Sequence, residues 1–132
     1  MIARIDDYLE VFVGEPIVHR SEEKFLRALS VFANDRKLPL LVFSNFELSG
    51  RQFDFVVVTA ACVAVVEIKS SAFPVRGDIN GRWEYATADG GWASVTNGYQ
   101  QVLQRKHILR DAMEGISGRR LGFCLHQVPA CA

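Results

Sequence analysis

Two short apolar runs, close together in the middle of the chain, dominate the hydrophobic pattern. Residues 55–58 are FVVV and residues 63–66 are VAVV. Runs this short and this rich in valine and phenylalanine are typical of strands that are covered on both faces. The small residues 59–62 between them suit the turn of an antiparallel hairpin. The pattern therefore predicts a buried hairpin over residues 52–70.

Apolar residues at helical spacing predict helices on either side of this hairpin. One apolar face, formed by Phe25, Leu26, Leu29 and Phe32, indicates a helix over residues 21–34. A second helix is expected over residues 98–114, with Asn97 as its cap and with Gly115 and Gly118 ending it. A short helix is also expected near residues 5–13, before Gly14 and Pro16.

The remaining elements are expected to be strands. Residues 40–43 and 121–128 are apolar and of strand length, and Ser49-Gly50 marks a turn into the central hairpin. The turn-rich segment after residue 70 contains a small outer hairpin, residues 83–85 and 92–95. This order of elements predicts an α/β fold in which a central mixed β-sheet is flanked by helices.

Composition narrows the class of protein. The chain has 132 residues, of which 49% are hydrophobic, which fits one domain with a real core. Lys+Arg and Asp+Glu number 15 each, so binding to nucleic acid would need a local patch of positive charge. No apolar run is long enough to span a bilayer and no signal peptide is visible, so we expect a cytoplasmic protein without a membrane partner. The three cysteines lack zinc-binding spacing, and Cys62 and Cys124 are expected to be buried thiols.

Three charged residues interrupt the apolar hairpin: Asp54, Glu67 and Lys69. Side chains alternate along a strand, so Glu67 and Lys69 should share a face. Buried charges are costly unless they are paired or bind a metal, and Mg²⁺ favours one or two carboxylates with water. Asp54, Glu67 and the backbone carbonyl of Ile68 are therefore candidate metal ligands, with Lys69 placed to polarise water or stabilise developing charge. A structural salt-bridge cluster is the alternative.

These residues also carry a resemblance to known proteins. An aspartate on one strand, followed 13 positions later by Glu-x-Lys on the next, resembles the PD-(D/E)xK nuclease superfamily. The neighbouring segments look like the NERD, or nuclease-related, domain: SEE in the preceding helix, FDFVVVT, VVEIKS, Trp83 in a glycine-rich hairpin, and NGYQQ opening the next helix. The similarity covers residues 18–113. It implies a single domain over residues 1–132, with a restriction-endonuclease-like core at about 18–128.

The resemblance implies a metal-dependent nuclease that uses Mg²⁺ or Mn²⁺ to hydrolyse phosphodiester bonds, with DNA as the expected substrate. Asp54 and Glu67 would bind the metal and Lys69 would be the catalytic lysine. Glu23 would approach the site from the first long helix, through water or a second metal. Gln101 would support the site from the second helix. One departure is Gly98, which stands where the family commonly has proline; proline is favoured at a first helical position but is not required there.

Other charged and aromatic residues are weaker candidates. Four basic residues could contact nucleic-acid phosphates, although solvent exposure alone would also explain them: Arg76, Arg82, Arg105 and Lys106. The aromatic residues Trp83, Tyr85 and Trp92 are assigned to hairpin packing rather than to base stacking.

Two other functions remain open at this point. The domain could be a catalytically inactive module that binds nucleic acid or docks another protein, or a structural domain that forms a homodimer through its hairpin edge. Proteins that resemble this one often join the domain to a helicase, kinase or zinc-binding module, and the abrupt end after the last predicted strand suggests a domain from a longer protein. DNA and RNA, and endonuclease and exonuclease action, are not distinguished by these residues.

Overall fold

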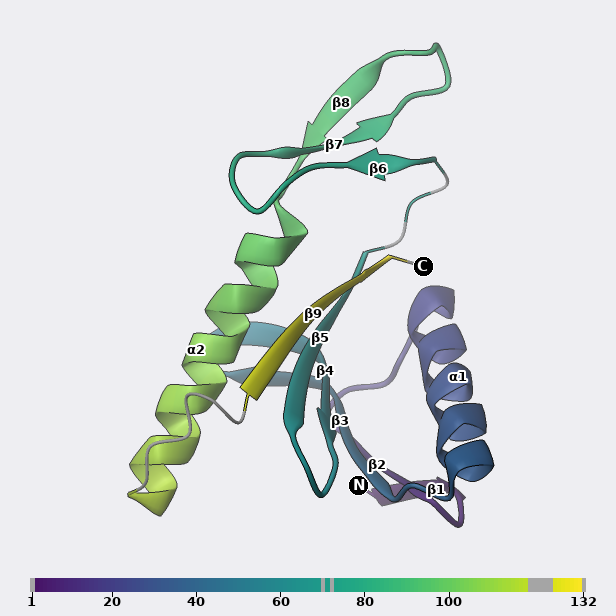
Figure 1. Ribbon diagram of the computed structural model, residues 1–132, viewed down its shortest axis with the longest axis vertical. Coiled ribbons are helices and arrows are strands. Elements are labelled where there is room, and N and C mark those ends of the chain that lie inside the picture. Colours follow the sequence, from purple (N-terminus) through teal and green to yellow (C-terminus); the bar gives the residue numbers. More distant parts are fainter. Residues whose placement is uncertain (1, 70, 72, 119–124, 132) are drawn as a thin grey trace.

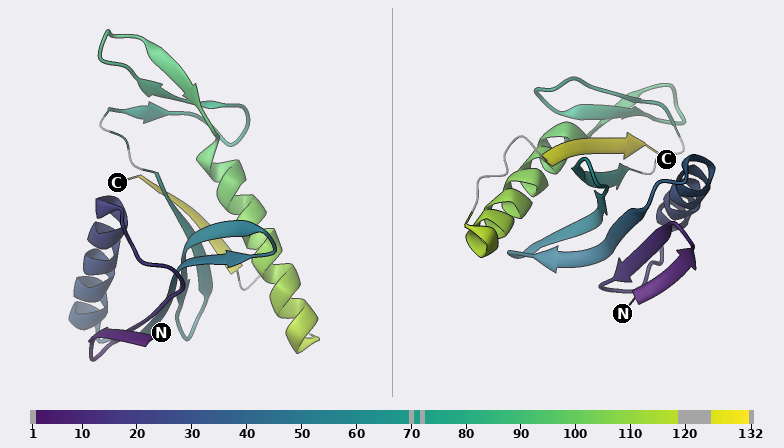
Figure 2. Two further views of the ribbon diagram at one scale, coloured as in Figure 1. Left: turned by 180° about the vertical axis from the view of Figure 1, so that it is seen from behind. Right: turned by 60° about the horizontal axis from the view of Figure 1, so that its bottom comes forward.

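In the computed structural model, the described residues are 2–69, 71, 73–118 and 125–131, and they form a mixed β-sheet between two helices (Figures 1 and 2). The sheet has the strand order β1-β2-β3-β4-β5-β9. Its strands are β1 Ile2–Asp6, β2 Leu9–Val13, β3 Leu40–Leu48, β4 Arg51–Val58, β5 Val63–Lys69 and β9 Leu125–Cys131. Strand β2 is parallel to β3 and β5 is parallel to β9, whereas the other neighbours are antiparallel. The predicted α/β fold with a central mixed sheet is confirmed.

The short helix expected near residues 5–13 is wrong, because this segment forms the β1–β2 hairpin. Leu9 and Val11 are completely or almost completely buried, at 0% and 1% exposure. That period of two belongs to a strand, and the segment is too short for its pattern to exclude a helix. Strand β2 then pairs with β3 across a helical connection.

The central hairpin predicted over residues 52–70 is present as β4 and β5. Strand β3 precedes it and is longer than the expected residues 40–43, since it continues through Leu48. The turn from β3 to β4 is Ser49-Gly50, and both residues have positive φ, 51° and 74°. Two successive residues in this conformation match the right-handed twist of a tight hairpin.

Each long helix covers one face of the sheet, as Figure 1 shows. Helix α1, Arg20–Arg36, buries Leu26 and Ala33 in a core that includes Phe55 of β4. Helix α2, Gly98–Ser117, buries Val102 against Val65 of β5 on the other face. Both predicted helices are confirmed, with small shifts at their ends. Gly118 is the left-handed cap of α2, whereas Gly115 lies inside the helix.

A small three-stranded sheet lies beyond the N-terminus of α2 (Figure 1). Its strands are β6 Val75–Arg76, β7 Trp83–Ala86 and β8 Trp92–Val95, so the predicted outer hairpin is confirmed and gains a strand. The side chain of Asn97 caps α2 by accepting a hydrogen bond from the Gln100 amide, 3.1 Å. Its Nδ2 group also lies 2.6 Å from the carbonyl oxygen of Gly81 and 3.1 Å from that of Ile79. Asn97 therefore joins the small sheet to α2.

Gly98 has a packing role at the same junction. A Cβ atom at this position would meet the Trp83 ring at 2.8 Å. Trp83 also donates its indole N–H to the carbonyl of Asp78, 2.8 Å, which confirms its assignment to hairpin packing.

Three smaller expectations depend on the described part of the chain. Within that part, no helix is long and apolar enough to cross a membrane. Cys62 is a free thiol in the β4–β5 turn and is partly exposed rather than buried. The last predicted strand, 121–128, overlaps β9, but residues 121–124 lie outside the described residues.

Candidate active site

The site begins where β4 and β5 separate. Their antiparallel pairing runs from Val58–Val63 to Phe55–Val66 and stops immediately before Asp54 and Glu67. At that point the backbone amide of Ile68 donates to Asp54 Oδ2, 2.8 Å, so a side chain takes the place of a strand carbonyl. The Asp54 and Glu67 side chains line the same cavity, and the charge of Asp54 acts on the Glu67 carboxyl group. The two predicted ligands are thus brought together at the open end of the hairpin.

Glu67 is buried in an environment that disfavours its charge. The residue is 3% exposed, and among the described residues its Oε1 atom has no hydrogen-bond partner. Burial, followed by the charge of Asp54, raises the pKa of Glu67 to about 8. Arg105 and Lys69 oppose this shift but do not cancel it. Glu67 therefore retains its proton at neutral pH.

Lys69 and α2 complete this side of the site. Lys69 Nζ donates to Gln101 Oε1, and both residues line the same cavity as Glu67, as expected from strand alternation and from the position of Gln101. Arg105, one turn further along α2, places its Nε 3.7 Å from Glu67 Oε1 and 3.3 Å from the carbonyl oxygen of Gln52. The helix supplies an acceptor for the lysine and a cation for the buried glutamate.

These groups surround a cavity of about 330 Å³. Its lining includes the predicted site residues Asp54, Glu67, Ile68, Lys69, Gln101 and Arg105, together with His19, Ser21, Glu22 and Gln52. The cavity is bounded by strands β4 and β5 and by both long helices, so segments far apart in the sequence meet there.

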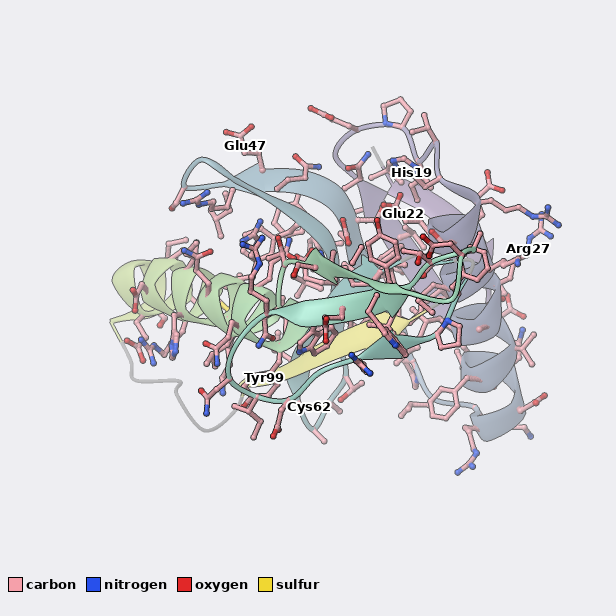
Figure 3. The ribbon with its side chains drawn as sticks, turned by 90° about the horizontal axis from the view of Figure 1, so that it is seen from above. His19, Glu22, Arg27, Glu47, Cys62 and Tyr99 are labelled. Carbon is pink, nitrogen blue, oxygen red and sulfur yellow. The ribbon has the colours of Figure 1, made fainter. Side chains whose placement is uncertain are left out.

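The acidic residue that α1 brings to this cavity is Glu22, whereas the sequence had suggested Glu23. Glu22 is 8% exposed and lines the cavity, while Glu23 is exposed and borders a separate surface hollow with Lys24 and Arg27. Figure 3 shows Glu22 at the start of α1 and Arg27 directed away from the rest of the molecule. Burial and then the charge of Asp54 raise the pKa of Glu22, and His19 lowers it. The signal for Glu22 was in the sequence, since Glu22 lies four residues before buried Leu26 and so shares its helix face.

Of the residues predicted to contact phosphates, only some lie at the site. Arg105 lines the site, but Arg76 lies on the small sheet, 3.1 Å from Glu84 and with its guanidinium 3.8 Å from the Trp92 ring centre. Neither Arg82 nor Lys106 is among the described residues that line the site cavity.

The donor set fits a hard divalent cation. Two carboxyl groups line the same cavity, one buried Glu67 oxygen lacks a hydrogen bond within the described residues, and a cation at this point would replace the proton of Glu67. In the described ranges no group of three or more His, Cys, Asp or Glu side chains has metal-binding geometry. Two carboxylates completed by water are nevertheless what Mg²⁺ commonly takes from a protein. Asp54 and Glu67 are the residues that would hold it.

A mixed sheet between two helices, with an aspartate and a Glu-x-Lys pair at the separated ends of two strands, defines a restriction-endonuclease-like domain. The model of the nuclease-related domain, NERD, matches residues 17–128. The chain therefore belongs to the NERD family. No curated protein and no solved structure matches it significantly.

Proposed function

We propose that the protein is a metal-dependent nuclease that hydrolyses phosphodiester bonds, with DNA as its substrate and Mg²⁺ or Mn²⁺ as its cofactor. One observation supports this most strongly. A buried glutamate, a half-buried aspartate and a lysine held by a glutamine line one cavity between the two long helices. Membership of a nuclease-related family supports the same chemistry.

The bound cation would supply Lewis-acid polarisation of the phosphate and a water of lowered pKa. The chain's own residues set the remaining conditions. Asp54 is fixed by the Ile68 amide, and Glu67 must lose its proton before it can act as a ligand, so its raised pKa couples activity to pH. Lys69 would stabilise negative charge on a phosphoryl oxygen, and Gln101 holds its ammonium group in place.

Arg105 gives the site its own positive charge. The chain has no net charge, so attraction of a polyanion depends on local groups. Arg105 lines both the site cavity and an adjoining cavity of about 530 Å³ that also contains Gln100 and Gln104. A phosphate that follows the reacting one along a strand would meet these donors.

The test is cleavage of labelled single-stranded and double-stranded oligonucleotides with Mg²⁺ or Mn²⁺. Lys69→Ala and Asp54→Ala should each reduce the rate by about 10²–10⁴-fold or more while circular dichroism stays unchanged. Lys24→Ala is the matched control, since Lys24 is an exposed lysine on α1 that borders a different hollow. If Lys69→Ala cuts as fast as the parent, the role of that residue is refuted. Salt-dependent binding without cleavage under either metal would favour the alternative, an inactive nucleic-acid-binding module.

A further inference from the structure

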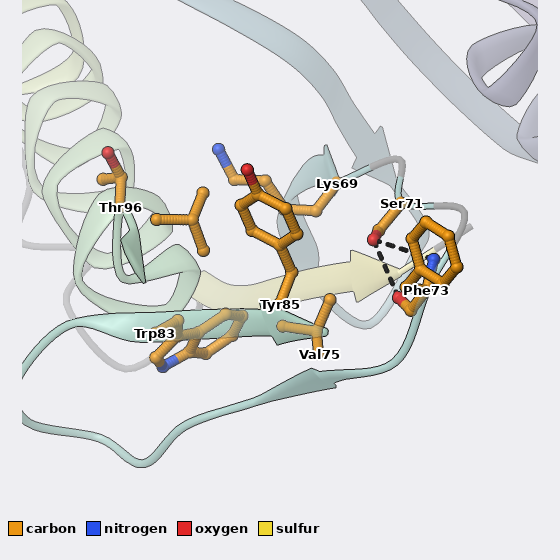
Figure 4. A pocket seen from close by; sticks show the side chains of 8 residues that line it. Lys69, Ser71, Phe73, Val75, Trp83, Tyr85 and Thr96 are labelled. Atoms are coloured by element: carbon orange, nitrogen blue, oxygen red, sulfur yellow. Dashed lines mark hydrogen bonds between the residues drawn. The ribbon is translucent and has the colours of Figure 1, made fainter. Parts of the chain in front are cut away.

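A second chamber adjoins the site on the other side of Lys69. Its volume is about 310 Å³, and it lies between the end of β5 and the small sheet. Figure 4 shows Val75, Trp83 and Tyr85 on the small sheet, with the Tyr85 side chain extending toward Lys69. The described lining holds one charged residue, Lys69, and no carboxylate. The chamber is thus an apolar, aromatic space with one cation at its edge.

Two aromatic side chains that line this chamber, Tyr85 and Phe73, remain partly exposed to solvent. Tyr85 is 38% exposed and Phe73 is 45% exposed, although both line the chamber. Phe73 is positioned by Ser71, whose hydroxyl donates to the Phe73 carbonyl, 2.7 Å. Trp83, by contrast, is held by Asp78 and Gly98. Both side chains therefore keep exposed surface at the chamber, which differs from the assignment of Tyr85 to packing alone.

The chamber shares lining residues with the two polar cavities. Lys69 is shared with the site cavity, and Thr96 is shared with the cavity that contains Gln100 and Arg105. A ligand that lies in all three must combine a flat apolar group with anionic groups on either side. A nucleotide within a strand has this chemistry, because its base is attached close to the phosphates that flank it.

We propose that this chamber binds one unpaired nucleobase, stacked on Tyr85 or Phe73, while the adjoining phosphate lies at Lys69. This inference rests on the proposed function and names its substrate class: single-stranded DNA, or strand ends and distorted sites where a base can leave the duplex. A base inside a regular duplex is stacked on both faces and cannot enter a chamber of this size without leaving the helix. Stacking on aromatic side chains accepts any base, so the chamber selects unpaired structure rather than sequence.

The test is binding of fluorescent oligonucleotides in EDTA, so that no cleavage takes place. The parent should bind a single strand more tightly than a duplex of the same length. Tyr85→Ala and Phe73→Ala should each weaken single-strand binding by about 5- to 100-fold, while Tyr85→Phe should retain it. A single strand that carries abasic sites throughout should bind the parent and Tyr85→Ala equally. Trp92→Ala is the matched control, because Trp92 is 41% exposed on the same small sheet but does not line the chamber.

Equal affinity of the parent for single strand and duplex would overturn the proposal. So would an equal loss with Trp92→Ala, or a loss with Tyr85→Ala that persists on the abasic strand. Because these measurements need no metal and no turnover, they separate the two proposals. A chain that binds unpaired bases but never cleaves would refute the nuclease assignment and leave the chamber supported. A chain that cleaves duplex and single strand equally, with no effect of Tyr85→Ala, would do the reverse.

Discussion

Replacing Glu67 by glutamine should stabilise the metal-free protein, by an amount that depends on pH. The pKa of this carboxyl is raised from 4.5 to about 8 by burial and by Asp54. A group with a raised folded-state pKa contributes its full stability below the unfolded value and loses it as pH rises through the folded value. For Glu67 the loss therefore develops between pH 4.5 and about 8.

The size of the effect follows from the width of that interval. Each pH unit between the two pKa values costs the folded state about 1.4 kcal/mol, so the cost is under about 1 kcal/mol at pH 5, about 3 kcal/mol at pH 7 and above about 4 kcal/mol beyond pH 8. Glutamine cannot ionise, so it does not carry this cost. The Glu67→Gln variant should thus be similar in stability to the parent at pH 5 and more stable by about 3 kcal/mol at pH 7.

Urea unfolding in EDTA at pH 5, 7 and 8.5, followed by circular dichroism, measures this difference. Glu47→Gln, at an exposed position of β3 (Figure 3), controls for the removal of a carboxylate as such. Mg²⁺ in millimolar excess should then stabilise the parent and not the Glu67→Gln variant, because only the carboxylate binds the cation. A stability difference that is the same at pH 5 and pH 8.5 would refute the assignment of Glu67 as a buried carboxyl that is protonated at neutral pH.

Three further predictions concern α1 and α2. Glu22→Gln should weaken Mg²⁺-dependent cleavage by about 10-fold or more, because carboxylates that support the metal ligands commonly have effects of this size. Glu23→Gln should leave cleavage unchanged in the same assay. Loss of cleavage with Glu23→Gln and not with Glu22→Gln would restore Glu23 as the site residue. Gly98→Pro should lower stability by about 1–3 kcal/mol in thermal unfolding, because a side chain there would overlap the packed indole, while Gly115→Ala, with open space around it, should raise stability by about 0.5–1 kcal/mol. Arg105→Met should reduce oligonucleotide affinity and the steepness of its salt dependence. It should also destabilise the protein more at pH 9 than at pH 7, because at pH 9 the parent guanidinium faces an ionised glutamate. Equal destabilisation at both pH values would contradict the 3.7 Å ion pair.

The central hairpin could be predicted because its signal is local. Valine-rich runs on either side of a short turn determine both strands, and alternation alone places Glu67 and Lys69 on one face. The cap at Asn97 is equally local and was correct. The N-terminal hairpin was missed because its local signal is weak. A segment of a few residues does not distinguish a strand period of two from a helix period of 3.6. The strand that pairs with β2, β3, lies beyond α1 in the sequence.

The site could be predicted only as far as strand geometry reaches. The choice between Glu22 and Glu23 depends on the rotation of α1 against the sheet, which tertiary packing of Leu26 determines. The ion pair of Arg105 with Glu67 depends in the same way on which face of α2 meets β5. The chamber beside Lys69 depends on the position of the small sheet, which no periodicity in the chain specifies.

The hydrogen bonds of Asn97 have a mechanical consequence. The side chain of this one residue binds the start of α2 and, at the same time, the turn that leads into β7. The small sheet and the first turn of α2 should therefore move together. Gln101, in that turn, holds Lys69, and Tyr85, on the sheet, borders the chamber. A shift of the small sheet would thus move Tyr85 and, through Gln101, the ammonium group of Lys69 together.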